Sequence, residues 1–118
     1  MRQANLKITH FVLEFFGCES SLSNARFISA ALHRAIKQTK MTKLHSYSHS
    51  FQPSGVTSVI VLKESHLSIH TWPEYNYAAI DLFTCGKKED AAHALRSLVE
   101  NLKPRRVKHQ EIRRGTGR

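Results

Sequence analysis

Four strand-like segments follow one another in the middle of this chain, separated by very short links. Residues 43–51 alternate in polarity, residues 56–62 are largely apolar, and residues 66–72 and 77–84 repeat with a period of two. Pro53, Ser54 and Gly55 mark one turn, and residues 73–76 mark another. Links of hairpin length cannot cross over a sheet, so they require neighbouring strands to be antiparallel.

Two amphipathic segments flank this region and predict helices. Residues 22–39 follow the N-capping hydroxyls of Ser20, Ser21 and Ser23, and residues 88–102 carry one apolar stripe. Residues 5–16 and 105–112 add a first strand and a last, charged edge strand. The order predicts an α+β fold, a two-layer sandwich of a mainly antiparallel sheet with two helices on one face.

The run at residues 59–62 is apolar on both faces, which predicts that the sheet needs a second cover. With both helices on one side, the opposite sheet face of a monomer stays bare. An exposed apolar face of that size favours association. We therefore expect two protomers to stack sheet on sheet, giving an α/β/β/α homodimer.

The length of 118 residues predicts one domain, residues 1–118. No apolar run approaches the roughly 20 residues of a membrane span, and the N-terminus does not read as a leader. Cys18 and Cys85 fit neither a metal spacing nor a disulfide framework. These features predict a cytoplasmic protein without membrane partners.

The net charge of +9 lies mostly in a basic C-terminal tail, residues 103–118, which carries +6. Such a run is usually a solvated end, although it also suits phosphate contacts. A non-catalytic basic protein that binds nucleic acid is thus one hypothesis. The aromatic residues that RNA-binding sheets interleave with their cations are absent from this tail, so nucleic acid is the less favoured partner.

Reactive side chains gather in residues 64–74 (ESHLSIHTWPE) and 83–86 (FTCG). Strand periodicity places His66, Ser68 and His70 on one face and Leu67, Ile69 and Thr71 on the other. The two histidines are about 13 Å apart along an extended strand, too far to share a metal ion, and no metal is expected.

Ser65 stands at a hairpin junction, where a strained turn can press its hydroxyl onto the preceding carbonyl carbon. Antiparallel pairing of residues 66–72 with 77–84 would return Cys85 to the side of Ser65, which makes Cys85 a candidate acid. Cys18 reads as a small buried hydrophobic residue. Hydrolase elbows, phosphate-binding glycine loops and dinucleotide fingerprints are all missing from the sequence.

The blocks at residues 55–57, 64–74 and 77–86 closely resemble the short prokaryotic S-adenosylmethionine decarboxylase proenzymes. The resemblance implies a pyruvoyl enzyme made by self-cleavage between Glu64 and Ser65, with a β chain of residues 1–64 and an α chain of residues 65–118. Ser65 would become the pyruvoyl group, which forms a Schiff base with the substrate amine and draws electrons from the carboxylate bond. The expected product is the aminopropyl donor for polyamine (spermidine) synthesis.

The resemblance also assigns roles to single residues. His70 matches the proton acceptor in processing, supported by the Thr57 hydroxyl, and Cys85 matches the proton donor in decarboxylation. The substrate-binding residues would be Phe51, stacked on adenine, and Glu74, near the ribose.

Several positions depart from the family pattern, which has Gly-Val-Ser-Gly where this chain has GVTS at residues 55–58. Lys63 replaces a small residue and Asn76 a usual glycine. These departures leave open a pyruvoyl-dependent ornithine or arginine decarboxylase of the wider family. A poorly processed relative that regulates an active partner is a further hypothesis.

Overall fold

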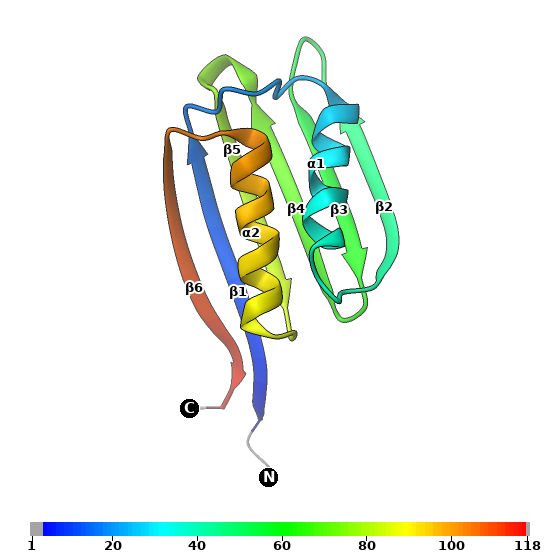
Figure 1. The fold of residues 1–118 in the computed structure, drawn as a ribbon, viewed down its shortest axis with the longest axis vertical. Helices are drawn as coiled ribbons and strands as arrows, with labels where there is room; N and C mark the ends of the chain where they lie inside the picture. The colour runs from blue at the N-terminus through cyan, green and yellow to red at the C-terminus, as the bar shows by residue number, and fades with distance from the viewer. Residues whose placement is uncertain (1–3, 118) are drawn as a thin grey trace.

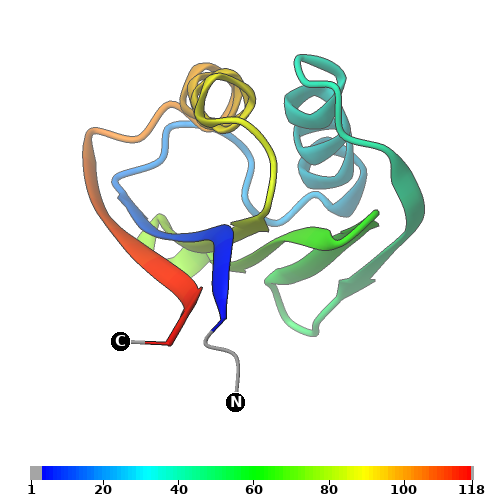
Figure 2. The same cartoon turned by 90° about the horizontal axis from the view of Figure 1, so that it is seen from below.

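The computed structural model describes residues 4–117 as one six-stranded sheet covered on one face by two helices (Figures 1 and 2). The strand order is β2-β3-β4-β5-β1-β6, and every neighbouring pair is antiparallel. This confirms the two-layer α+β prediction. The elements are β1 (Asn5–Phe16), α1 (Ala25–Lys37), β2 (Lys43–Ser50), β3 (Val56–Leu62), β4 (Ser65–Trp72), the 3-10 turn η1 (Pro73–Tyr75), β5 (Tyr77–Thr84), α2 (Lys88–Leu102) and β6 (Arg106–Thr116).

Helix α1 begins three residues later than the serine pattern predicts. The side chain of Asn24 accepts a hydrogen bond from the Phe27 backbone N–H at 3.0 Å, so Asn24 is the N-cap. The Ser20 hydroxyl instead donates to the carbonyl of Leu102, at the end of α2. One of the predicted capping hydroxyls therefore ties the β1–α1 loop to the second helix.

The core fills the space between the sheet and the helices. Strand β4 contributes Leu67, Ile69 and Thr71 to this layer, and its alternate residues His66, Ser68 and His70 face the other way. The period-two reading of this strand is thus confirmed. The largest fully buried side chains include Phe15, Ile28, Leu32, Ile60, Leu82 and Leu98.

The sheet face that the helices leave uncovered, here called the open face, is mixed rather than apolar as expected. Val61 and Trp72 are exposed on it, but polar residues alternate with core residues along β1, β4 and β5. Tyr77, for example, donates a hydrogen bond to Glu14 across this face at 3.0 Å. The apolar run in β3 is therefore not representative of the whole face.

The basic C-terminal segment is an ordered edge strand over most of its length. Strand β6 pairs with β1 from Phe16↔Arg106 to Asn5↔Thr116 and extends four residues beyond the predicted end at 112. All of its residues are exposed, and the charged edge agrees with the role of lysine and arginine in keeping edge strands from pairing with other sheets. Neither helix in residues 4–117 is long and apolar enough to cross a membrane.

Candidate active site

The turn between β3 and β4 holds the bond at which the sequence predicts cleavage. Leu62 pairs with Ser65, so only Lys63 and Glu64 form the turn. Glu64 has a φ of 62°, a left-handed conformation that costs a non-glycine residue about 1 kcal/mol. The Lys63 N–H is anchored on the Thr42 carbonyl at 3.0 Å. The residue that precedes Ser65 is therefore held in the strained conformation that the short hairpin suggested.

Cys85 lies against this turn. Its Sγ is 3.8 Å from the backbone carbonyl oxygen of Glu64 and 3.8 Å from the side-chain Oε2 of the same residue. The pairing of His66 with Phe83 brings the end of β5 back to the start of β4, as predicted. Glu64, Ser65 and Cys85 form what we call the serine half-site. A pocket of about 200 Å³ beside it includes Lys63, Ser65, Thr84, Cys85, Gly86 and Asp90 in its lining.

A second group of predicted residues gathers at the opposite end of β4. Thr57 Oγ1 lies 2.9 Å from His70 Nδ1, because these residues are register partners across β3 and β4. Phe51 and Glu74 line the same pocket, whose volume is about 350 Å³. Phe51, Thr57, His70 and Glu74 form the histidine half-site. The Thr57 hydroxyl and the ring of His70 are thus in direct contact.

The two half-sites do not meet within one chain. Ser65 and His70 are separated by five residues of extended strand, or about 17 Å. Proton transfer needs a heavy-atom approach of about 3 Å or one bridging water. His70 therefore cannot take a proton from Ser65 of the same chain in this conformation.

Trp72 is a pocket residue that the sequence reasoning did not single out. It lines the histidine half-site pocket, is 42% exposed, and its ring centroid lies 6.4 Å from that of His70. The signal was present in the sequence, since Trp72 has the same strand parity as His70.

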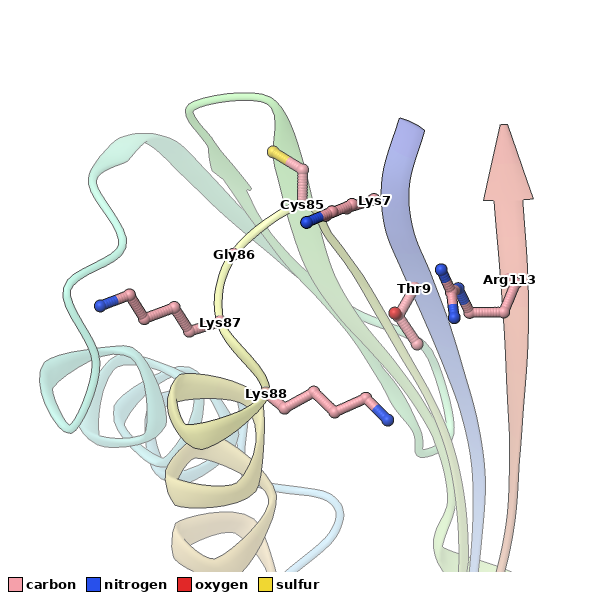
Figure 3. Close-up of a pocket in the computed structure, with 7 residues that line it drawn as sticks. All are labelled: Lys7, Thr9, Cys85, Gly86, Lys87, Lys88 and Arg113. Carbon is pink, nitrogen blue, oxygen red and sulfur yellow. The ribbon is translucent and has the colours of Figure 1, made fainter. Parts of the chain in front are cut away.

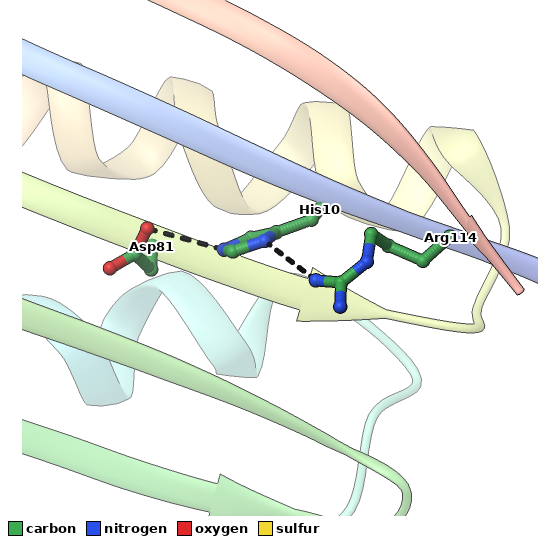
Figure 4. Close-up of polar contacts among 3 residues, drawn as sticks. All are labelled: His10, Asp81 and Arg114. Atoms are coloured by element: carbon green, nitrogen blue, oxygen red, sulfur yellow. Dashed lines mark hydrogen bonds and ion pairs between the residues drawn. The ribbon is translucent and has the colours of Figure 1, made fainter.

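A polar cluster on the open face also went unnoticed (Figure 4). His10 Nε2 lies 3.2 Å from Asp81 Oδ1, while Arg114 Nη1 approaches His10 Nδ1 at 3.4 Å. Beside it, His66 stacks on Phe83 with the ring planes 5° apart. These contacts join residues far apart in the sequence, so no local motif indicates them.

The structure explains two departures from the family pattern. Asn76 has a φ of 51°, and asparagine tolerates this left-handed conformation better than most residues that could replace glycine. Ser58 is buried, and its hydroxyl lies 2.7 Å from that of Ser48 on the neighbouring strand. The extra side chain at residue 58 is therefore satisfied by a cross-strand partner.

The two cysteines have opposite environments. Cys18 is 4% exposed and packs in the core, and burial raises the pKa of its thiol from 9.0 to about 11. Cys85 is exposed beside the turn. Within residues 4–117, no cluster of three or more His, Cys, Asp or Glu side chains is arranged to hold a metal ion.

Comparison with known proteins gives a family and a fold for this chain. A family model described as S-adenosylmethionine decarboxylase matches residues 9–115. The chain belongs to this family, whose members are carboxy-lyases.

Individual relatives agree with this family assignment. The chain is 46% identical over 107 residues to the S-adenosylmethionine decarboxylase proenzyme of Thermotoga maritima, covering 90% of this chain and 82% of that protein. It is 41% identical over 107 residues to the proenzyme of that name from Sulfurihydrogenibium, covering 90% and 80%. The crystal structure of the adenosylmethionine decarboxylase from Aquifex aeolicus superposes with a TM-score of 0.88 at 34% identity, covering 95% of this chain and 93% of that one.

Proposed function

We propose that this chain is a pyruvoyl-dependent S-adenosylmethionine decarboxylase, activated by its own cleavage at the Glu64–Ser65 bond. The observation that carries the proposal is the left-handed Glu64, whose carbonyl oxygen lies 3.8 Å from Cys85. Such a turn raises the energy of the uncut peptide and places a thiol beside the bond to be cut. The products would be a β chain of residues 1–64 and an α chain of residues 65–118.

The cleavage uses this chain's own atoms. Ser65 Oγ attacks the Glu64 carbonyl carbon, and the peptide nitrogen leaves with a proton, so the amide becomes an ester. Loss of the Ser65 α-proton then breaks the Cβ–O bond and releases the Glu64 carboxylate. Hydrolysis of the remaining enamine releases ammonia and leaves a pyruvoyl group at residue 65. That group supplies the electron sink for decarboxylation.

The thiol of Cys85 would hold the proton that the product carbon needs after carbon dioxide leaves. The Sγ atom of Cys85 contacts the turn, and the exposed thiol can be reached by a substrate. Phe51, Trp72 and Glu74 line one pocket. The ring of Phe51 can stack on a base, and the carboxylate of Glu74 can accept hydrogen bonds from a ribose. Ornithine and arginine carry no aromatic group, so this pocket favours S-adenosylmethionine and a product that donates the aminopropyl group of spermidine.

The α-proton acceptor must come from a second copy of the chain. His70 lies on the open face, about 17 Å along β4 from Ser65. If two open faces stack about a two-fold axis near the middle of β4, the strand directions reverse across the interface. The partner's His70 then lies over the Ser65 end of the first protomer. We therefore infer an α/β/β/α homodimer with two composite active sites, each built from a serine half-site and the partner's histidine half-site.

Mixed dimers test this arrangement. Ser65→Ala and His70→Ala chains with different tags should each remain uncut when produced alone. Produced together, the His70→Ala chain should be cut, because its Ser65 meets the intact His70 of the Ser65→Ala chain. A His45→Ala chain, which loses a histidine from the edge strand β2, serves as the matched control and should cut itself normally. Cleavage of the His70→Ala chain on its own would show that the histidine is not required.

Release of carbon dioxide from S-adenosylmethionine, ornithine and arginine, measured side by side, tests the substrate. We expect release from S-adenosylmethionine alone, and a higher KM in Phe51→Ala. Activity of the purified chain without an added partner would exclude the regulatory hypothesis. A wild-type protein that stays uncut and inert would refute the proposal.

We also propose that the enzyme works in the cytoplasm. Both cysteines are free thiols in the structure, which suits a reducing compartment. The nucleic-acid hypothesis receives less support, because residues 103–118 contain no aromatic side chains interleaved with their cations.

A further inference from the structure

Positive side chains from three distant segments meet in a pocket where β1, β6 and the start of α2 come together (Figure 3). This corner pocket has a volume of about 400 Å³ and is lined by Lys7 and Thr9 of β1, Arg113 of β6 and residues 85–88. Thr9 and Arg113 are register partners, so a hydroxyl and a guanidinium lie side by side. In Figure 3 the Lys88 ammonium faces the same space, whereas Lys87 extends away from it.

The cations of the corner pocket are poorly compensated. Among residues 4–117, the carboxylate within ion-pairing distance of Lys7, Lys88 or Arg113 is that of Glu111, 3.9 Å from Lys88 Nζ and well exposed. Lys7, Lys88 and Arg113, counted together with the carboxylate of Glu111, therefore keep an excess of two positive charges. Like charges drawn together from separate segments repel one another unless a counter-charge is bound.

We propose that the corner pocket binds the phosphate group of a small molecule. A phosphate carries nearly two negative charges at neutral pH, which matches the excess. It is tetrahedral and accepts hydrogen bonds from several sides, so it suits a forked guanidinium, two ammonium groups and a hydroxyl arranged around a hollow. The sulfonium substrate is a cation and would be repelled from this pocket.

The corner pocket lies apart from the open face. Thr9 has the strand parity of Phe11, a core residue, so Thr9 and its partner Arg113 lie on the helix side of the sheet. Stacking of two open faces would leave the pocket accessible. The inference therefore does not depend on the proposed catalytic function, although the loop at residues 85–88 that lines the pocket also carries Cys85.

Calorimetric titration of the wild-type protein with pyrophosphate tests the inference. At physiological salt we expect one saturable site per chain, weakened at least tenfold by Lys7→Ala and by Arg113→Ala. Arg113→Lys, which keeps the charge but loses the fork, should fall between these variants and the wild type. Lys108→Ala is the matched control, because Lys108 lies on the same strand but on the open face, where it is the register partner of Glu14. It should change the affinity less than twofold.

Parallel titrations with ATP and with inorganic phosphate distinguish a nucleotide from a free anion. Tighter binding of ATP than of pyrophosphate would assign the site to a nucleotide, and equal binding would assign it to the free phosphate group. Absence of a saturable site for all three probes would overturn the proposal. Equal weakening by Lys7→Ala and Lys108→Ala would also overturn it, because that result describes diffuse charge attraction. The proposal would also be overturned if a single-stranded oligonucleotide bound more tightly than pyrophosphate and its binding depended on Lys108.

Discussion

Replacement of Thr71 by valine should destabilise the fold more than its small change in shape suggests. Thr71 is buried, and its hydroxyl accepts a hydrogen bond from the Val56 N–H and donates one to the Leu22 carbonyl, both at 2.8 Å. It therefore ties β4 to β3 and to the segment before α1. Valine leaves both backbone groups buried without this partner.

The expected loss follows from those two groups. An unsatisfied buried polar group costs about 1–3 kcal/mol, so two cost about 2–4 kcal/mol after partial relaxation. The added methyl group returns about 0.8 kcal/mol. The net loss of about 1–3 kcal/mol corresponds to a melting temperature roughly 4–12 °C lower for a domain of this size. Thr71→Ser keeps the hydroxyl and loses one methyl group, which costs about 1 kcal/mol.

Urea unfolding should be measured in the Ser65→Ala background, where the chain is expected to stay whole and two-state analysis applies. The predicted order of stability is threonine, then serine, then valine. If the valine variant is more stable than the serine variant, packing of the methyl group rather than the hydrogen bonds of Thr71 holds this junction, and the reasoning is wrong.

The remaining predictions concern the two thiols and the turn. A thiol-alkylating reagent should modify Cys85 and spare Cys18 in the folded protein, as mass spectrometry of digested fragments would show; equal labelling would contradict the burial of Cys18. Because burial raises the pKa of Cys18 from 9.0 to about 11, the unfolded chain releases this proton first as the pH rises. The thiol's contribution to the free energy of unfolding is thus complete below pH 9.0 and falls by up to about 3 kcal/mol toward pH 11, a slope that Cys18→Ala should reduce in urea titrations. Glu64→Gly should relieve about 1 kcal/mol of backbone strain and slow self-cleavage about fivefold, followed on denaturing gels. Wild-type cleavage kinetics in that variant would show that the left-handed turn does not drive the reaction.

The fold was largely predictable because short links left few topologies open. Four strands joined by hairpin-length links admit one pairing order, and the period of β4 correctly assigned Leu67 and Ile69 to the core. The start of α1 was placed too early because a run of serines and an asparagine compete for the capping position, and only the tertiary contact of Ser20 with α2 decides between them.

The site was predictable in its parts but not in its layout. The juxtaposition of Cys85 with the Glu64 turn followed from strand pairing, which is a local property of a hairpin. The distance from Ser65 to His70 could also be calculated from the rise per residue of a strand. The family resemblance nevertheless assigned both residues to one site, because they lie close together in one sequence motif. The corner pocket and the contact of His10 with Asp81 needed the β1–β5 and β1–β6 pairings, which link the two ends of the sequence.

The separation of Ser65 from His70 along β4 has a consequence for kinetics. Under the mechanism proposed above, a chain with its nucleophile and its proton acceptor about 17 Å apart cannot mature by a unimolecular reaction before it finds a partner. Maturation should then be second order in newly made protein at low concentration and become first order once encounters are no longer limiting. The amount of chain that the cell makes would itself set a threshold for the appearance of activity.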